Sequence, residues 1–257
     1  MNRKVAIFCL PVMLAMTSGT PSPAAQAPLP ENAPCRSVRF EGTPFTVCTA
    51  DPGRHDIALL GRGANGAPIR DFAGVPARLG NAFPRLAFAM NAGMFDDAGD
   101  PIGLYVEDGR QLVGLNRQTG AGNFYRPPPN GIFYGTATGW HVATTTDFAA
   151  HRPAAVAFAT QSGPMLVING AINPGFDKNG LSLHIRNGVG ITRDGYAIFA
   201  ISDARVSFGR FARLFRQLGC TDALYLDGAV SRLWAPAMRR RDGGRKIGPI
   251  VVALQKR

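Results

Sequence analysis

Several signatures of well-known enzyme classes are missing from this 257-residue chain. It has no P-loop, no Gly-x-Ser-x-Gly elbow and no His-Glu-x-x-His motif, which would indicate nucleotide binding, a serine hydrolase or a zinc protease. No Cys-x-x-Cys pair exists, and the four histidines have no zinc-ligand spacing; they are His55, His141, His151 and His184. We therefore expect no resident metal and no other cofactor.

The chain also lacks a long hydrophobic run: no apolar segment reaches the ~18 residues that span a bilayer. Instead, Arg3 and Lys4 precede a short apolar stretch at 5–16, and Ala25-Gln26-Ala27 follows as a small-x-small cleavage site. This order is typical of a cleaved secretory signal peptide, the alternative being an uncleaved anchor. We predict a signal peptide at 1–27, a periplasmic or secreted protein, and no stable membrane insertion after cleavage.

Acidic residues are scarce, with 17 Asp and Glu against 28 Lys and Arg, giving a net charge of +11. From Ala237 onward, Asp242 stands against seven basic residues: Arg239, Arg240, Arg241, Arg245, Lys246, Lys256 and Arg257. Such a tail can dock on an anionic polymer or membrane surface, but a solvated loop before the last strand is the favoured interpretation. Aromatic residues do not alternate with the basic ones, so nucleic acid is not a predicted partner.

The expected mature chain keeps three of the four cysteines. Cys35 and Cys48 flank two short strands joined by a turn at Gly42, which brings their ends together. We predict a Cys35–Cys48 disulfide, with two unpaired thiols as the alternative. Cys220 lies beside an apolar strand with no His or Lys close by in sequence, so a buried, unreactive thiol is predicted.

Glycine and proline are abundant, at 31 and 20 residues, which favours many short strands over a helical bundle. Strands are expected at 57–60, 86–90, 102–107, 131–134, 165–168, 188–192, 196–202, 223–226 and 250–254. Apolar side chains at helical spacing predict a helix over 208–218, and a weaker helix at 72–79 is interrupted by Pro76. With 28–34 as a Pro-rich linker, we predict one α+β domain at 35–257, with mostly antiparallel β-sheets and a few packed helices.

Three predicted strands end in the same way, with a polar side chain followed by a small residue. Asn91, Asp203 and Asp227 occupy these ends, followed by Ala92, Ala204 and Gly228. Such ends place a polar group at the rim of a rigid sheet and keep the neighbouring backbone open to a ligand. Each site alone also fits an ordinary turn, but if the ends meet, two carboxylates and a carboxamide share one site.

Two further segments carry groups that suit an anionic ligand. Arg186 precedes a Gly-rich strand beginning near Gly188 and could grip a phosphate bidentately. Ser162 and Gly163 precede a buried strand and offer hydroxyl and amide donors. The alternatives that involve no ligand are a surface position for Arg186 and an ordinary turn at Ser162 and Gly163.

Six segments together resemble the phosphodiester glycosidase family, and most closely its bacterial secreted branch. They are 91–95, 103–107, 161–165, 186–190, 200–203 and 225–228. The resemblance implies cleavage of a sugar-1-phosphodiester at the anomeric carbon. This chemistry requires a carboxylate as nucleophile or base and a cation that balances the leaving phosphate.

On this resemblance, Asp227 is the first choice for the catalytic carboxylate, Asp203 is the second, and Arg186 balances the phosphate. The other residues expected to contact substrate are Asn91, Gly93, Glu107, Ser162, Gly163, Gly188 and Gly228. Glu107 also fits a solvated position in a hairpin.

The predicted function is a metal-independent secreted hydrolase that cleaves the glycosidic bond of a sugar-1-phosphodiester in envelope or exopolysaccharide glycans. Ala92 and Ala229 stand where one branch of the family has glycine or a glycine-rich run, which motivates an alternative. That alternative is a non-catalytic protein that binds phosphoglycans or assists envelope assembly. A third hypothesis is a metal-assisted phosphodiesterase in which Asp203 and Asp227 hold a cation.

Overall fold

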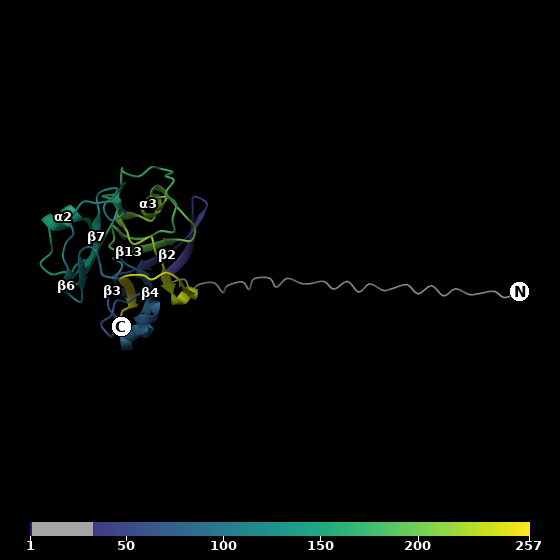
Figure 1. The fold of residues 1–257 in the computed structure, drawn as a ribbon, viewed down its shortest axis with the longest axis horizontal. Coiled ribbons are helices and arrows are strands. Elements are labelled where there is room, and N and C mark those ends of the chain that lie inside the picture. Colours follow the sequence, from purple (N-terminus) through teal and green to yellow (C-terminus); the bar gives the residue numbers. More distant parts are fainter. Residues whose placement is uncertain (2–32) are drawn as a thin grey trace.

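The computed structural model describes residues 33–257 and Met1 (Figure 1). The rest of the predicted signal peptide (1–27) and residues 28–32 of the predicted linker lie outside the described part. Residues 33–257 form three β-sheets and a few short helices, and every paired strand runs antiparallel to its neighbour. The predicted α+β class and single domain are confirmed. Within the described residues, no helix has the length and hydrophobicity needed to cross a membrane.

The first sheet has seven strands in the order β1-β2-β13-β12-β14-β10-β11. Its strands are β1 (Cys35–Phe40), β2 (Thr43–Ala50), β10 (Met165–Ile168), β11 (Ala171–Ile172), β12 (Asn187–Thr192), β13 (Ala197–Ser202) and β14 (Cys220–Tyr225). One face carries Phe199 and Leu224 into the central core, and the opposite face packs on helix α3 (Phe208–Gln217) through Tyr225. Figure 1 shows α3 above this sheet, near β13.

The second sheet has five strands in the order β16-β15-β4-β17-β3. They are β3 (His55–Leu60), β4 (Leu86–Asn91), β15 (Leu233–Ala235), β16 (Arg240–Arg241) and β17 (Ile250–Gln255), with the short 3₁₀ helix η3 (Pro236–Met238) between β15 and β16. Its outer face is covered by η1 (Phe72–Gly74), α1 (Val75–Leu79) and η2 (Gly80–Arg85). Phe72 and Val75 are buried there against Leu60 and Val252.

The third sheet has five strands in the order β6-β5-β9-β7-β8. They are β5 (Tyr105–Glu107), β6 (Arg110–Val113), β7 (Gly131–Thr136), β8 (Gly139–Thr144) and β9 (Phe158–Ser162). Helix α2 (Thr145–Ala150) covers its outer face through Phe148. Thr144 caps this helix by accepting a hydrogen bond from the Asp147 amide.

The inner faces of the three sheets share one hydrophobic core. Phe88 of the second sheet and Phe133 of the third both pack edge-on against Phe199 of the first, with ring centroids 5.2 and 5.7 Å apart. Because one core joins all three sheets, strand ends that are distant in sequence are brought close together.

The predicted helices differ in how well they form. The 208–218 helix is confirmed, and Ser207 caps it by accepting a hydrogen bond from the Arg210 amide. The 72–79 segment is not one helix: a 3₁₀ turn ends at Gly74, and Pro76 lies in the first turn of the five-residue α1. Proline is tolerated at that position because the first amides of a helix have no partner within it.

The cysteine predictions are confirmed. Cys35 and Cys48 are directly opposite each other in the β1–β2 ladder and form a disulfide. Cys220 is free and buried, and burial raises the pKa of its thiol to about 12. A thiol with so high a pKa is a poor nucleophile at neutral pH.

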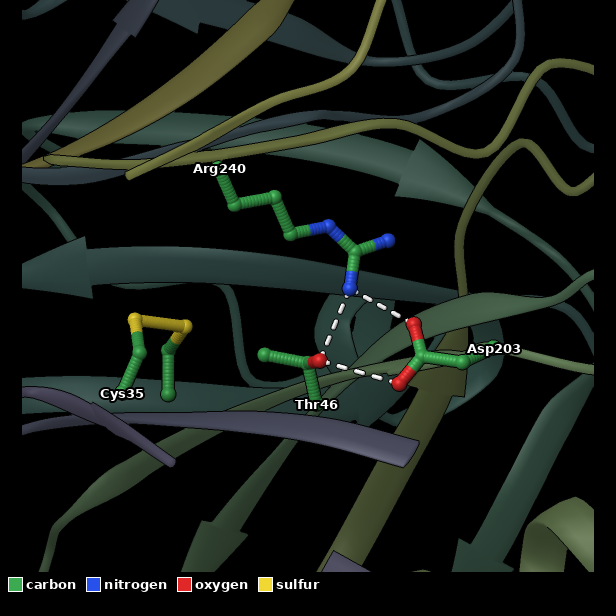
Figure 2. Close-up of a disulfide and its surroundings, with 5 residues drawn as sticks. Cys35, Thr46, Asp203 and Arg240 are labelled. Carbon is green, nitrogen blue, oxygen red and sulfur yellow. Dashed lines mark hydrogen bonds and ion pairs between the residues drawn. A yellow bond between two sulfur atoms is a disulfide. The ribbon is translucent and has the colours of Figure 1, made fainter. Parts of the chain in front are cut away.

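The basic tail is only in part the solvated loop that the sequence favoured: residues 243–246 form an exposed loop before β17, but the arginines that precede it are structured. Arg240 and Arg241 form β16, which pairs with β15. Arg240 donates to Asp203 at 2.6 Å, to Thr46 at 2.7 Å and to Asp242 at 2.9 Å, as Figure 2 shows for the first two contacts. The tail therefore reaches from the second sheet to strands β2 and β13 of the first.

Candidate active site

Asn91, at the end of β4, is the centre of a buried hydrogen-bond network. Its Nδ2 donates to the Asp227 carbonyl at 2.9 Å, and its Oδ1 accepts from the Arg232 amide at 2.8 Å. Asn187 Nδ2 donates to the same Oδ1 at 3.1 Å, and Ser231 Oγ donates to Asn187 Oδ1 at 3.2 Å. This network joins the second sheet, the first sheet and the loop that follows β14.

Asp227 is the second residue after β14 and is 8% exposed. Its amide donates to the Ala92 carbonyl, and its Oδ1 accepts from the Ala229 amide at 3.0 Å. No arginine, lysine or histidine of residues 33–257 forms an ion pair with it. Burial raises the pKa of Asp227 to about 6, although the Ala229 amide and the positive charge of Arg245 act in the opposite direction. The group is therefore mostly ionised at pH 7, but it takes up a proton more readily than a solvated aspartate.

A cavity of about 560 Å³ lies beside Asp227. The five residues that follow Asp227, from Gly228 to Arg232, form one side of it. The other sides come from the segment before β12, the end of β13 with the loop after it, and β16 with the loop after it. Among these residues are His184, Ser202, Asp203, Arg205, Arg240, Asp242 and Arg245. The cavity therefore combines carboxylates and hydroxyls with four arginines.

Asp203 lines this cavity with a side chain that is 27% exposed. Its Oδ1 pairs with Arg240 at 2.6 Å, and its Oδ2 accepts from Thr46 Oγ1 at 3.0 Å (Figure 2). Both carboxylate oxygens of Asp203 have side-chain partners, whereas Asp227 accepts only from the Ala229 amide, through Oδ1. Arg240 also pairs with Asp242 at 2.9 Å, so one guanidinium compensates both carboxylates on this side.

Arg186 is placed on the other face of the first sheet. It is fully buried, its guanidinium carbon lies 3.5 Å from the centre of the Phe208 ring, and it also faces the Tyr225 ring. Its Nε donates to the Val206 carbonyl and one Nη to the Ser182 carbonyl, while the other Nη has no partner within residues 33–257. Because its guanidinium is enclosed by protein groups, Arg186 is not the surface arginine of the alternative interpretation, and its position does not offer the bidentate phosphate contact that the sequence predicted.

Arg186 still influences the candidate site through Tyr225. Burial raises the pKa of the Tyr225 hydroxyl to about 12, with the charge of Asp227 adding to the effect and that of Arg186 opposing it. A Cβ atom on Gly228 would collide with this hydroxyl. Any side chain at position 228 would thus displace either Tyr225 or the wall of the cavity.

The segment after Asn91 reaches the third sheet. The Gly93 amide donates to Thr160 Oγ1 at 3.1 Å, and a Cβ atom at Gly93 would collide with the Gln161 carbonyl. Ser162 lies two residues beyond Thr160 on the same face of β9, and its buried Oγ has no partner within residues 33–257. The Ser162 hydroxyl is therefore an unused donor.

Two of the predicted glycines have packing roles. A Cβ at Gly188 would come within 3.2 Å of the Phe211 and Phe215 rings of α3. A Cβ at Gly163 would approach the Phe124 carbonyl and the Asn130 side chain. Close packing against neighbouring segments therefore accounts for the glycine at both positions, and no contact with a ligand is needed to explain it.

Glu107 lies apart from the Asn91 network. Its Oε2 accepts from the Gly61 amide at 2.8 Å and from the Tyr105 hydroxyl at 2.9 Å, and its Oε1 pairs with Arg78 at 2.9 Å. Glu107 is buried where β3, β5 and α1 meet. The alternative interpretation of a solvated position in a hairpin is therefore wrong.

Sequence reasoning did not single out Asn187, Ser231, Arg232 or Arg205. Asn187 is adjacent to Arg186, and the alternation of a strand places neighbours on opposite faces, but only the structure shows which face meets Asn91. Arg205 and Arg232 come from two separate loops, and no sequence pattern connects them with Arg240 and Arg245 of the basic tail.

Within the described part of the chain, no three side chains of His, Cys, Asp or Glu gather in a way that could hold a metal ion.

Comparisons with known proteins bear on the family and on the fold. The sequence profile described as phosphodiester glycosidase matches residues 85–252, which include Asn91, Asp203 and Asp227. "Uncharacterized protein YigE" of Escherichia coli (strain K12) is 37% identical over 187 residues, 72% of this chain and 72% of that protein.

Among solved structures, the zebrafish N-acetylglucosamine-1-phosphodiester alpha-N-acetylglucosaminidase catalytic domain, auto-inhibited by its pro-peptide, superposes with a TM-score of 0.57. It is 15% identical, and the match covers 87% of this chain and 82% of that one. A hypothetical protein from Synechocystis superposes with a TM-score of 0.54 at 15% identity, covering 86% of this chain and 61% of that one. These likenesses show a shared fold, and the profile match together with the Escherichia coli relative shows the family: the chain belongs to the phosphodiester glycosidases.

Proposed function

We propose that this protein is a hydrolase that cleaves the glycosidic bond of a sugar-1-phosphodiester, with Asp227 as the catalytic carboxylate. The observation that carries the proposal is the environment of Asp227. It is a buried carboxylate without an ion-pair partner in the described residues, its pKa is raised to about 6, and it lies beside a cavity rich in arginine.

The chemistry of the bond fits these groups. Cleavage at the anomeric carbon builds positive charge on the sugar, and an adjacent carboxylate stabilises that charge as nucleophile or as the base that activates water. The departing phosphomonoester is a weak base, so it needs charge compensation more than a proton. Arg205, Arg232 and Arg245 can provide this compensation from the walls of the cavity.

In this proposal Asn91 and Arg186 are positioning residues. Asn91 holds the Asp227 carbonyl and the Arg232 amide, so it sets the distance between the carboxylate and one wall of the cavity. Arg186 supports Tyr225, which packs against Gly228. Asp203 anchors Arg240 at the opposite wall.

We further propose an extracytoplasmic location and a substrate among envelope or exopolysaccharide glycans. The signal-like sequence at 1–27 and the Cys35–Cys48 disulfide support this location, because disulfides persist in oxidising compartments.

A non-catalytic phosphoglycan-binding protein is the second candidate. The observation that favours it is the low exposure of Asp227, which leaves its carboxylate behind Gly228 and Ala229 rather than open on the cavity surface. The metal-assisted phosphodiesterase is less well supported, because Arg240 and Thr46 already occupy both Asp203 oxygens.

The experiment is an activity assay on N-acetylglucosamine-1-phospho-methylmannoside and on teichoic-type polymers, with wild type, Asp227→Asn and Asp194→Asn. In the Asp227→Asn variant the side-chain amide oxygen can still accept from the Ala229 amide, so this variant should fold. Asp194 is an exposed turn residue and provides the matched control.

We expect turnover by wild type and Asp194→Asn and a loss of at least about 10³-fold in Asp227→Asn. Equal turnover by Asp227→Asn would refute the role of Asp227. Binding of the polymers without turnover would support the second candidate.

A further inference from the structure

A second cavity, of about 550 Å³, lies at the third sheet. Residues 117–119, which follow β6, form one wall, and residues 145–146 and 149–150 of α2 form another. The segment before β7 completes it with Tyr125 and Asn130. This cavity shares no lining residue with the one beside Asp227. Its volume lies within the range of about 300–1,000 Å³ that is typical of ligand sites.

Polar side chains line this cavity without using their hydrogen-bonding groups on one another. Asn130 is half-buried, and its main-chain carbonyl accepts from the Thr145 amide at 3.0 Å, but its carboxamide has no partner within residues 33–257. Four further lining side chains also make no hydrogen bond or ion pair to residues 33–257: Arg117, Gln118, Thr119 and Thr146. Together these five groups supply donors and acceptors for a ligand.

Gln161 of β9 ties the walls of the cavity together. Its buried Oε1 accepts from the Leu104 and Asn116 amides, both at 2.9 Å. Its Nε2 donates to the Asn116 carbonyl at 2.7 Å and to Thr145 Oγ1 at 3.0 Å. The segment that leads into residue 117 is thus joined to the start of α2. Because both walls are already held in place, a ligand would order little of the protein when it binds.

Tyr125 gives the cavity an aromatic surface. Its ring is half-buried and packs edge-on against Phe124, with the centroids 4.9 Å apart. Its hydroxyl accepts from Asn116 Nδ2 at 3.3 Å. A Cβ atom at Gly120 would lie 2.9 Å from this ring, so glycine lets the loop pack closely on it. A tyrosine ring combines an apolar body with a polar tip, and it suits a ligand that has both kinds of surface.

The charges around the cavity narrow the class of ligand. Arg117 is the only charged side chain of residues 33–257 that lines it. Without a carboxylate, the cavity neither attracts a cationic ligand nor offers the group that glycoside cleavage requires. A single arginine also makes it a weaker site for anions than the cavity beside Asp227, which has four. An uncharged ligand rich in hydroxyl groups, with an apolar face, fits this combination best.

We propose that this cavity binds a pyranose residue of a glycan at a site separate from Asp227. Each sugar hydroxyl both donates and accepts, so it can pair with the free groups of Asn130, Gln118 and Arg117. The C–H face of the sugar ring packs on Tyr125 and on the neighbouring prolines of the wall. This proposal goes beyond the proposed function and does not depend on hydrolysis at Asp227.

Calorimetry on the purified protein with chitotriose, maltotriose and mannotriose tests the proposal. We expect at least one of these uncharged trisaccharides to bind with a Kd of about 1 mM or lower. Asn130→Ala and Gln118→Ala should each weaken that binding at least about fivefold, because each removes a free amide from the cavity. Neither side chain makes a hydrogen bond to residues 33–257, so both variants should fold. Asn123→Ala is the matched control, since Asn123 is an exposed amide of the same loop and does not line the cavity.

Several results would overturn the proposal. One is the absence of binding by all three trisaccharides up to about 10 mM. Another is an affinity that Asn130→Ala and Gln118→Ala leave within about twofold of wild type, or that Asn123→Ala lowers equally. Asp227→Asn should bind the trisaccharide as tightly as wild type, and loss of binding in that variant would assign the sugar to the other cavity. Because the measurement needs no turnover, binding with this pattern supports the proposal even if no sugar-1-phosphodiester is cleaved.

Discussion

The side-chain amide of Asn91 donates a hydrogen bond of 2.9 Å to the main-chain carbonyl of Asp227, a residue 136 positions further along the chain. Asn91 ends a strand of the second sheet, and Asp227 follows a strand of the first. The bond therefore fixes the relative position of two sheet edges at the point where the candidate carboxylate lies. Its loss should disturb both the fold and the site.

Replacing Asn91 by alanine tests this connection. The variant leaves the Asp227 carbonyl and the Arg232 amide without their partner in a buried setting. Asn187 Nδ2 loses one of its two acceptors and keeps the main-chain carbonyl of residue 91. We expect the free energy of unfolding to fall by about 2–4 kcal/mol, measured by urea denaturation. Gln118→Ala removes an exposed amide that makes no side-chain hydrogen bond in the described residues, and should change stability by less than about 0.5 kcal/mol. Similar losses in the two variants would contradict a structural role for Asn91.

Asp227 should make stability depend on pH in an unusual direction. Its pKa rises from 3.8 to about 6 on folding, so the folded protein holds a proton that the unfolded chain releases. The stability linked to this proton is fully present below pH 3.8 and is lost as the pH rises through about 6. Relative to Asp227→Asn, wild type should lose on the order of 2–3 kcal/mol of unfolding free energy between pH 4 and pH 7.

Urea denaturation of both proteins across this pH range measures the effect. The difference between the two proteins isolates Asp227 from the other titrating groups. A difference that stays constant from pH 4 to pH 7 would show that the Asp227 pKa is not raised by folding.

The same carboxylate predicts the pH profile of catalysis. A nucleophile or base acts in its ionised form, so kcat/KM on a sugar-1-phosphodiester should fall about tenfold per pH unit below the Asp227 pKa of about 6. This fall in kcat/KM at low pH should persist in the Asp203→Asn variant, because Asp203 is already paired with Arg240. A rate that is flat across pH 6, or that rises as the pH drops, would contradict this role.

The disulfide makes a separate prediction about stability. Cys35 and Cys48 close a loop with a sequence separation of 13, and a chain-entropy estimate for such a loop is about 3 kcal/mol. Reducing agent should lower the free energy of unfolding of wild type by about this amount and leave the Cys35→Ser/Cys48→Ser protein unchanged. An equal response of both proteins would mean that reduction acts elsewhere.

Much of the fold follows from local sequence patterns. The strands around Phe88, Phe199 and Val252 read as short apolar runs bounded by turn residues, and the helix from Phe208 has apolar side chains at helical spacing and a serine cap. Both signals depend on residues that are near each other in sequence. The 72–79 segment departs from its prediction because Gly74 and Pro76 divide it between two kinds of helix.

The candidate site was less accessible to sequence reasoning. Strand ends predicted that Asn91 and Asp227 could meet, and their hydrogen bond brings them together. The face of the first sheet on which Arg186 lies could not be predicted. Alternation along a strand places Arg186 and Asn187 on opposite faces, but it does not show which of these faces helix α3 covers. Glu107 binds Arg78 and the Gly61 amide through contacts that span up to 46 positions, which no local pattern encodes.

The position of bond cleavage tests the central claim most directly. The reaction is run in oxygen-18 water on N-acetylglucosamine-1-phospho-methylmannoside, and the products are analysed by mass spectrometry. If a carboxylate acts at the anomeric carbon, the label enters the released sugar and the phosphate stays unlabelled. Label in the phosphate would mean attack at phosphorus and would contradict the assignment of Asp227 as a glycosidase carboxylate.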